Sequence, residues 1–312
     1  MTVKIVTDST SDLTPEMASK LGITVVPLFV HFGTRAYQDG IDLTTEDFYR
    51  KLAKSKTLPR TSTPSPGTFA EAYDKLAQET DEILVITLSS KYSKTYETAL
   101  QGKEMRKSKC CVEVIDSYSS IMKLGLLCIA AAKAALSGAS LADVIGVTRS
   151  NMQRVEVRMA FDTLEYLKRG GRIGTAQAFF GSMLRINPIL TIKDGYTEAV
   201  ARTRSRARAI EHLYDFAMSF FHIEEMAVED ATTPDEAQIL VERLSARFPR
   251  EQIYRTKVSP VVGTHVGPHV LAVAILGEKG LSGEVEKSAY EVSLVNYSQL
   301  SAGVGTIHLS GG

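Results

Sequence analysis

The sequence predicts an α/β fold with two domains, a mainly parallel sheet in the N-terminal domain and a mixed sheet in the C-terminal domain. Its 312 residues exceed the size of a typical single core, which favours two domains. In the first half, short β-branched runs alternate with helical patterns, as they do in βαβ units. In the second half, the Asp194-Gly195 turn joins two apolar runs, which indicates antiparallel pairing.

In the first half, the expected strands are separated by helices. Residues 3–7 favour a strand, and Thr14, Pro15 and Glu16 then mark a helix start, because Thr accepts from free N–H groups and Pro suits the first turn. The same pattern predicts strands at 23–28, 83–88 and 111–115, and helices at 46–53, 68–79, 93–105, from 121 and at 141–153. The right-handed crossover rule places helices on both faces of such a parallel sheet.

A domain boundary is expected near Gln153. Beyond it the sequence favours a strand at 155–161, a short helix at 162–168, a helix from Thr175, the hairpin 186–201, helices at 204–221 and 234–247, and strands at 224–228, 253–258 and 270–276. We therefore expect domains at 1–153 and 154–278. The remaining tail, 279–312, is rich in Ser and Gly, and the sequence leaves its structure open.

Composition argues against several classes of function. Thirty-six Lys and Arg balance thirty-six Asp and Glu, so no overall charge favours nucleic acid or an anionic membrane. The three cysteines form no CxxC pair, which suits a reducing cytoplasm better than a disulfide framework or a zinc site. No signal peptide is evident, and the apolar run 121–136 is too short to span a bilayer. We expect a cytoplasmic protein without nucleic acid, metal or cofactor.

Hydroxyl groups concentrate where three strands of the predicted parallel sheet end. The three loops are 8–12, which contains Ser9, 89–95, which contains Ser93 and Thr95, and 116–120, which contains Ser117. Carboxyl ends of parallel strands meet at one edge, where α/β folds bind ligands, so these hydroxyls favour a small oxyanion or a carboxylate. The alternative is that they only cap helices.

Three other features have two interpretations each. Residues 60–67 favour a stiff hydroxyl-rich loop, either a binding loop or a linker. Residues 263–269 favour a glycine-containing loop in which His265 either donates to a carboxylate or is structural. Basic residues also cluster in the second domain: Lys168, Arg169, Arg172, Arg185, Arg202, Arg204, Arg206 and Arg208. This cluster either contacts a phosphate or an acidic partner, or forms a solvated helix face. The sequence lacks a phosphate-loop motif, a dinucleotide fingerprint and a GxSxG elbow.

Taken together, these motifs resemble those of the DegV family, bacterial fatty-acid-binding proteins that are carrier subunits of a fatty acid kinase. The resemblance covers roughly residues 3–278. It is carried by VTDSTSD at 6–12, TSTPS at 61–65, SKYSKTY at 90–96, IDS at 115–117, DTLEYLKRGGRI at 162–173, RTR at 202–204 and GTHVGP at 263–268. The chain departs from the family where Lys94 and His269 stand, since the family often has Gly at both positions.

The resemblance implies a lipid tunnel between two α/β domains and a non-catalytic carrier. The fatty-acid carboxylate would be held by Thr61, Ser62 and Ser93, with His265 nearby; Ser9, Thr95 and Ser117 are lesser candidates. The resemblance further implies that a partner kinase phosphorylates the bound carboxylate in phospholipid synthesis and contacts Arg169, Arg172 and Arg202.

The energetics of an acyl chain fit this expectation. The expected ligand has roughly 14 to 18 carbons, and a chain of about 16 carbons gains about 12 kcal/mol on burial before ordering costs, enough to leave a membrane during transient contact. Two alternatives are a hydrolase or phosphotransferase that uses the hydroxyl loops, and a regulatory or scaffold protein that binds another anionic lipid.

Overall fold

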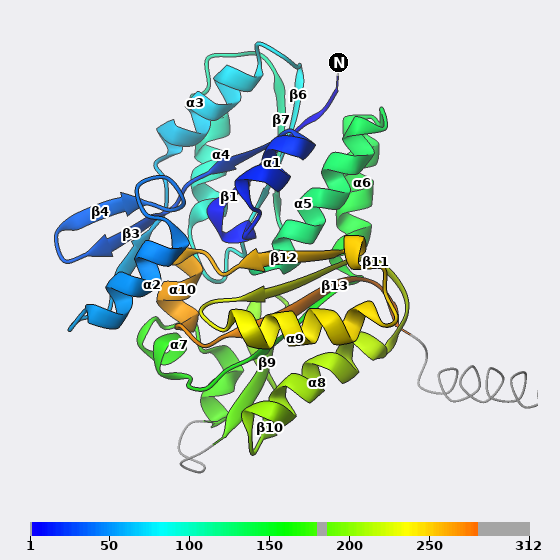
Figure 1. Ribbon diagram of the computed structural model, residues 1–312. Helices are drawn as coiled ribbons and strands as arrows, with labels where there is room; N and C mark the ends of the chain where they lie inside the picture. Colours follow the sequence, from blue (N-terminus) through cyan, green and yellow to red (C-terminus); the bar gives the residue numbers. More distant parts are fainter. Residues whose placement is uncertain (1, 180–185, 280–312) are drawn as a thin grey trace, which may run out of the picture.

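The protein is described by a computed structural model that covers residues 2–179 and 186–279 (Figure 1). These residues contain a four-stranded sheet ordered β2-β1-β6-β7, a six-stranded sheet ordered β10-β9-β8-β13-β11-β12 and a three-stranded sheet ordered β4-β3-β5. The first sheet is parallel and the second is mixed, so the predicted fold class is confirmed. The tail 280–312 and Arg185 lie outside the described residues.

Helices cover both faces of the parallel sheet, as the crossover rule predicts. In β6, the side chains of Ile83 and Val85 pack in one core, and those of Leu84 and Ile86 pack in another, because successive residues face opposite sides. The strands are β1 (Lys4–Asp8), β2 (Ile23–Val26), β6 (Glu82–Thr87) and β7 (Cys111–Asp116); the helices are α1 (Pro15–Leu21), α3 (Pro66–Leu76), α4 (Thr95–Met105), α5 (Ile121–Leu136) and α6 (Leu141–Met152).

The six-stranded sheet has α8 (Arg206–Met218) and α9 (Pro234–Ser245) side by side on one face (Figure 1). Its strands are β8 (Val155–Ala160), β9 (Asn187–Lys193), β10 (Tyr196–Thr203), β11 (Phe220–Asp230), β12 (Ile253–Lys257) and β13 (Leu271–Lys279). The predicted Asp194-Gly195 hairpin joins β9 to β10, and both turn residues have positive φ, as a two-residue turn of this type requires.

Helix α5 lies between the two large sheets. It contacts β1 and β6 of the parallel sheet and β8, β11 and β13 of the mixed sheet. Twelve of its sixteen residues are buried, so the apolar run is an internal helix. Of the helices that the structure describes, none combines the length and apolarity needed to cross a bilayer.

A third, small sheet was not predicted. It consists of β3 (Phe29–Phe32), β4 (Arg35–Gln38) and β5 (Arg60–Ser62), and it lies near α2 (Thr45–Lys54) and α10 (Pro260–Val266). The segment 60–67 is therefore not simply a loop: it forms β5, a short link and the start of α3. A strand of three residues is too short for an alternating pattern to reveal it.

Three other element predictions were wrong in detail. The segment 263–269 is not a loop throughout, because α10 extends to Val266 and carries His265 in its last turn. The helix expected from Thr175 is a 3-10 helix, η2 (Gly174–Phe179). The helix predicted at 204–221 ends at Met218, because Phe220 begins β11 and packs in the core.

The remaining short elements are η1 (Ser9–Ser11), α7 (Glu165–Arg169) and η3 (Arg250–Gln252). The predicted boundary residue Gln153 lies between α6 and β8. The largest core cluster includes residues from both sides of this position, among them Leu84 and Leu276.

Candidate functional site

A cavity of about 330 Å³ lies where the carboxyl edge of the parallel sheet meets α10 and the six-stranded sheet. All three hydroxyl-rich loops contribute to its lining: Thr10 follows β1, Ser93 follows β6 and Ser120 follows β7. β1 and β7 both flank β6 in the sheet, so the three loops do share one edge, as the sequence predicts.

Most of the cavity wall is apolar. Aliphatic and aromatic side chains come from the segments after β2, β6 and β8, from α5, α7 and α10, and from the mixed sheet: Leu28, Leu88, Ile121, Met159, Phe161, Leu167, Ile192, Val261, Val262 and Val266. A predominantly apolar concave site with a few convergent polar groups is the usual form of a small-molecule site. The large apolar part of the wall suits a ligand with a hydrocarbon chain.

Two of the predicted site residues, Thr61 on β5 and His265 on α10, meet in the cavity although 204 positions separate them. Thr61 Oγ1 lies 2.9 Å from His265 Nε2. Burial, and secondarily the nearby Arg172 guanidinium, lowers the pKa of His265 to about 4, so the imidazole is neutral at pH 7. Its Nδ1 is buried without a partner and faces Gly170, where a Cβ atom would lie only 2.3 Å from it.

The other two predicted residues, Ser62 and Ser93, also line the cavity. Ser62 Oγ lies 2.8 Å from His31 Nε2, and Ser93 Oγ lies 2.8 Å from Thr95 Oγ1. Ser93 stands immediately before α4, whose N-cap is Lys94 and lacks a side-chain cap hydrogen bond.

This uncapped start distinguishes α4 from α2, α3 and α6, whereas α5 shares it, because its N-cap Ser120 also lacks a side-chain cap hydrogen bond. In α2 and α6, the N-cap side chains of Thr44 and Ser140 accept from a backbone N–H of the first turn. In α4 the first-turn N–H groups have no such acceptor, and they lie beside Ser93 at the cavity. Free N–H groups at a helix start attract an anion.

The charged residues of the lining are Lys94 and Arg172, and neither Asp nor Glu is among them. Arg172 Nε and Nη2 donate to the carbonyl of Tyr92 at 3.1 and 2.8 Å, and its Nη1 donates to that of Gly170. Tyr92 is held in turn, since its hydroxyl lies 2.9 Å from Thr197 Oγ1. The polar wall therefore offers hydroxyls, N–H groups and two cations, which favours an anionic head group.

The lesser candidates do not line this cavity. Ser9 accepts the N–H of Leu28 at 3.1 Å and lines a separate cavity of about 780 Å³. Thr95 is buried behind Ser93, and the Ser117 hydroxyl accepts the N–H of Ser119 inside its own loop at 3.0 Å.

The predicted partner-facing arginines are differently engaged. Arg169 is exposed and forms an ion pair with Glu165 one turn earlier in α7. Arg202 places its guanidinium 4.2 Å from the ring centre of Phe179. Arg172, described above, turns into the protein and lines the cavity.

Several lining residues were not singled out from the sequence. Thr10 and Ser120 lie in two of the predicted hydroxyl-rich loops. The hydroxyl pattern therefore indicated the correct loops, but it did not indicate which of their residues line the cavity. Thr197 comes from β10, where no local pattern indicated a role. No group of three or more His, Cys, Asp or Glu within 2–179 and 186–279 is arranged to hold a metal ion.

Comparison with known proteins shows the family of this chain. The family model described as "uncharacterised protein, DegV family" matches residues 2–278. The chain belongs to the DegV family. A DegV domain-containing protein of Clostridium acetobutylicum is 36% identical over 287 residues, which cover 90% of this chain and 100% of that one.

Solved DegV structures share the fold. One, described as showing fatty acid binding of a DegV family protein from Thermus thermophilus, has a TM-score of 0.81 and 32% identity, and covers 89% of this chain and 100% of that one. Another, DegV from Bacillus subtilis, described as a fatty acid binding protein, has a TM-score of 0.80 and 30% identity over the same shares.

Proposed function

We propose that this protein binds one long-chain fatty acid in the cavity and presents its carboxylate to a partner kinase. The proposal rests on the lining of this cavity of about 330 Å³, which we call the chamber. The lining is mostly apolar, its charged residues are Lys94 and Arg172, and it contains no Asp or Glu. Such a chamber accepts an amphipathic anion and disfavours a cation or a polar metabolite. The printed descriptions of the Thermus thermophilus and Bacillus subtilis relatives as fatty-acid-binding support the same ligand class.

The carboxylate sits among Thr61, Ser62, Ser93 and His265. With a proton on Nε2, neutral His265 donates to Thr61 Oγ1 across the 2.9 Å contact, which leaves the Thr61 hydroxyl proton free for the ligand. Ser93 and the uncapped N–H groups of α4 add further donors. Neutral donors orient a carboxylate without the tight ion pair of a bidentate Arg, so one oxygen stays available for reaction.

The protein acts as a carrier and not as a catalyst. The kinase supplies ATP and metal and transfers a phosphoryl group to the bound carboxylate, which gives an acyl phosphate for phospholipid synthesis. The exposed Arg169 and Arg202 contact the kinase. Arg172, which lines the chamber and donates to the carbonyl of Tyr92, contacts it beside the head group. This role places the protein in the cytoplasm with transient access to the membrane.

Native mass spectrometry of the purified protein tests ligand class. We expect a stoichiometric adduct with the mass of a fatty acid, identified after denaturing extraction. An empty protein that also fails to take up added palmitate or oleate would refute the proposal.

A second experiment tests the kinase. The loaded protein is mixed with a bacterial fatty acid kinase subunit and ATP, and acyl phosphate is trapped with hydroxylamine. Formation that requires both proteins supports the carrier role. Turnover by this chain alone would replace it with an enzymatic one, and binding without any phosphorylation would leave a regulatory lipid binder.

A further inference from the structure

The start of α5 carries a hydroxyl group that the proposed carboxylate site does not use. Its N-cap, Ser120, lines the chamber and is only 8% exposed. The hydroxyl of an N-cap serine normally accepts from the backbone N–H two or three residues further on. The Ser120 hydroxyl does not, and it has no hydrogen-bond partner among the residues that the structure describes. A buried hydroxyl group without a protein partner is available to a ligand.

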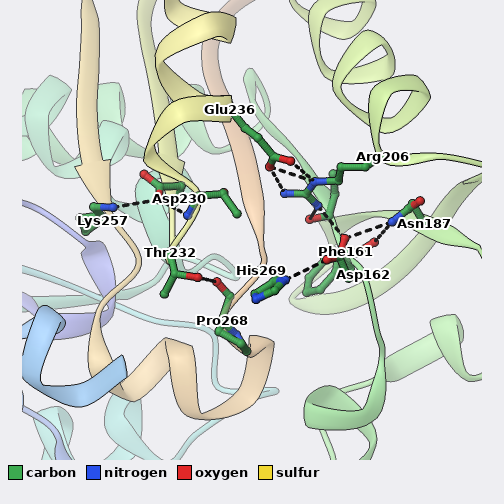
Figure 2. A network of polar contacts seen from close by, with 12 residues as sticks. Phe161, Asp162, Asn187, Arg206, Asp230, Thr232, Glu236, Lys257, Pro268 and His269 are labelled. Carbon is green, nitrogen blue, oxygen red and sulfur yellow. Dashed lines mark hydrogen bonds and ion pairs between the residues drawn. The ribbon is translucent and has the colours of Figure 1, made fainter. Parts of the chain in front are cut away.

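A carboxylate caps α5 in place of Ser120. Glu229 of β11 accepts the N–H of Met122, with its two oxygens at 3.2 and 3.4 Å. The end of β11 is fixed in turn, because Asp230 accepts from Lys257 Nζ at 2.8 Å (Figure 2). The start of α5 is therefore held by the mixed sheet, and the Ser120 hydroxyl is not needed to hold it.

A second hydroxyl of the chamber wall, that of Thr10, comes from η1, which packs against α5. The fit is close, since a Cβ atom added to Gly125 of α5 would lie 2.5 Å from the carbonyl oxygen of Ser11. Thr10 Oγ1 donates its proton to Asp8 Oδ1 at 2.6 Å, so it can only accept from a ligand. Ser120 still has its proton to donate. The two side chains thus offer a donor and an acceptor beside the start of α5.

The start of α5 is separate from the start of α4, where the carboxylate is proposed to bind. The two helices follow neighbouring strands but cover opposite faces of the parallel sheet. Ala99 of α4 packs in the core on one face, and Leu124 of α5 packs in the core on the other. Ser93 and Ser120 therefore approach the chamber from different faces, and the chamber has two polar regions.

The charges behind the second region favour a neutral ligand group. Asp8 lies behind Thr10, Glu229 lies behind the start of α5, and both carboxyl groups are fully buried. A second carboxylate or a phosphate would be repelled there. A neutral hydroxyl of the ligand can instead accept from Ser120 and donate to Thr10.

We propose that Ser120 and Thr10 form a second polar subsite of the chamber, which selects long-chain fatty acids that carry a hydroxyl group along the chain. This inference rests on the proposed fatty-acid binding and adds the substrate class of that site. A plain saturated chain that fills the chamber leaves the Ser120 hydroxyl unpaired, and that costs free energy. A site that pairs with a ligand hydroxyl discriminates against the analogue that lacks it.

The test is a competition of palmitate against monohydroxy palmitates, read by native mass spectrometry as the ratio of the bound species. The hydroxyl is placed beside the carboxylate, near the middle of the chain or at its far end. We expect the isomer whose hydroxyl reaches Ser120 to bind about tenfold more tightly than palmitate. Ser120→Ala should bring that ratio back to about one. The isomer with its hydroxyl beside the carboxylate should be unaffected, because that hydroxyl lies among the head-group residues.

Two further variants control for structural effects. Ser117→Ala removes a hydroxyl of the same loop that accepts the N–H of Ser119 and does not line the chamber, so it should leave every ratio as in wild type. Ser120→Cys keeps the size of the side chain with a weaker donor and should give an intermediate ratio. It also serves as the test if Ser120→Ala does not fold.

The outcomes distinguish the subsite from the proposed function. If wild type prefers no hydroxylated isomer over palmitate, or if its preference survives Ser120→Ala, the subsite is overturned while fatty-acid binding stands. A wild type that binds neither palmitate nor any hydroxylated isomer overturns the proposed function as well.

Discussion

The two ends of α10 have opposite chemistry. At its start, buried carboxylates accept from the backbone: Asp12 from the N–H of Ser259 at 3.2 Å and Asp39 from that of Val261 at 3.4 Å. At its end, His265 meets the hydroxyl of Thr61 beside a chamber whose lining residues include no carboxylate. A helix of seven residues therefore separates the acidic groups from the place where an anion is proposed to bind.

The same contrast appears in the proton affinities. Burial raises the pKa of Asp39 to about 7, and that of Glu229, which interacts with Asp12, also to about 7. Burial lowers the pKa of His265 to about 4. Burial therefore favours the neutral form of the titrating groups at both ends of α10. The carboxyl groups are neutral below their pKa, whereas the imidazole is neutral above its pKa. Raising the pH should therefore reduce the stability contributed by the groups at the start of α10 and increase the stability contributed by His265 at its end.

The largest expected effect concerns Asp39. Its folded-state pKa of about 7 lies above the ordinary 3.8, so its contribution to stability is complete at low pH and is lost as pH rises towards 7. Asp39→Asn cannot ionise, and we expect it to be more stable than wild type by about 2–4 kcal/mol at pH 8 and about equal at pH 4. Urea unfolding at both pH values measures this.

A matched exposed carboxyl serves as the control for that series. Asp235→Asn, in the exposed first turn of α9, should change stability by less than about 0.5 kcal/mol at pH 8. A difference between Asp39→Asn and wild type that does not grow with pH would contradict the assignment of a buried, proton-holding carboxyl at the start of α10.

At the other end of α10 the sign reverses. The folded-state pKa of His265 lies below its ordinary 6.5, so its contribution is present above pH 6.5 and is lost as pH falls towards 4. Relative to wild type, His265→Gln should therefore gain about 2–3 kcal/mol of stability between pH 7 and pH 4.5, because glutamine takes up no proton. A constant difference across this range would show that the imidazole is not held neutral.

Much of the parallel sheet could be predicted because its signals are local. Within the predicted strand 83–88, residues 83–86 form a continuous apolar run, and Thr14-Pro15 marks a helix start on its own. The third sheet could not, because β3, β4 and β5 have only three or four residues each. Helix α10 was missed because Gly263 and Gly267 resemble a loop, although Ser259-Pro260 is a start signal.

The site was predictable only in part for the same reason. Hydroxyl patterns at strand ends marked the correct edge of the sheet, but the contact of Thr61 with His265 joins positions far apart in sequence. The family resemblance supplied that pairing of residues; periodicity did not. The places of Lys94 and Arg172 in the lining depend on tertiary packing, which no local pattern encodes.

Ser93→Ala tests the hydroxyl that is proposed to donate to the fatty-acid carboxylate, and its expected effect is smaller. Loss of one hydroxyl donor to a carboxylate should weaken fatty-acid binding by about 1–3 kcal/mol, or roughly 5- to 150-fold, with little change in stability. Fluorescence competition measures the affinity. Ser117→Ala is the control, since that hydroxyl bonds within its own loop outside the chamber and its removal should leave affinity intact. Equal affinities for the two variants would remove Ser93 from the head-group site.

The smallest expected effect concerns Lys94, which is exposed at the edge of the chamber. Its ammonium group should attract the carboxylate through solvent, so Lys94→Met should weaken binding by about 0.3–1 kcal/mol at low salt. Because the Debye length falls from about 10 Å at 0.1 M salt to about 3 Å at 1 M, the loss should disappear at high salt. A loss that persists in 1 M salt would mean that Lys94 binds the carboxylate directly.

Lys91→Met provides the comparison that isolates the effect of position. Lys91 lies in the same loop and is also exposed, but it places its amine 5.7 Å from the ring centre of Tyr196 and does not line the chamber. At low salt, removing this charge should weaken fatty-acid binding less than removing the charge of Lys94 does. If the two variants lose affinity equally, the carboxylate is attracted by the positive charge of the whole loop and not by Lys94 in particular. The two ends of α10 would then differ in the pKa values of their buried groups more than in the placement of positive charge around the chamber.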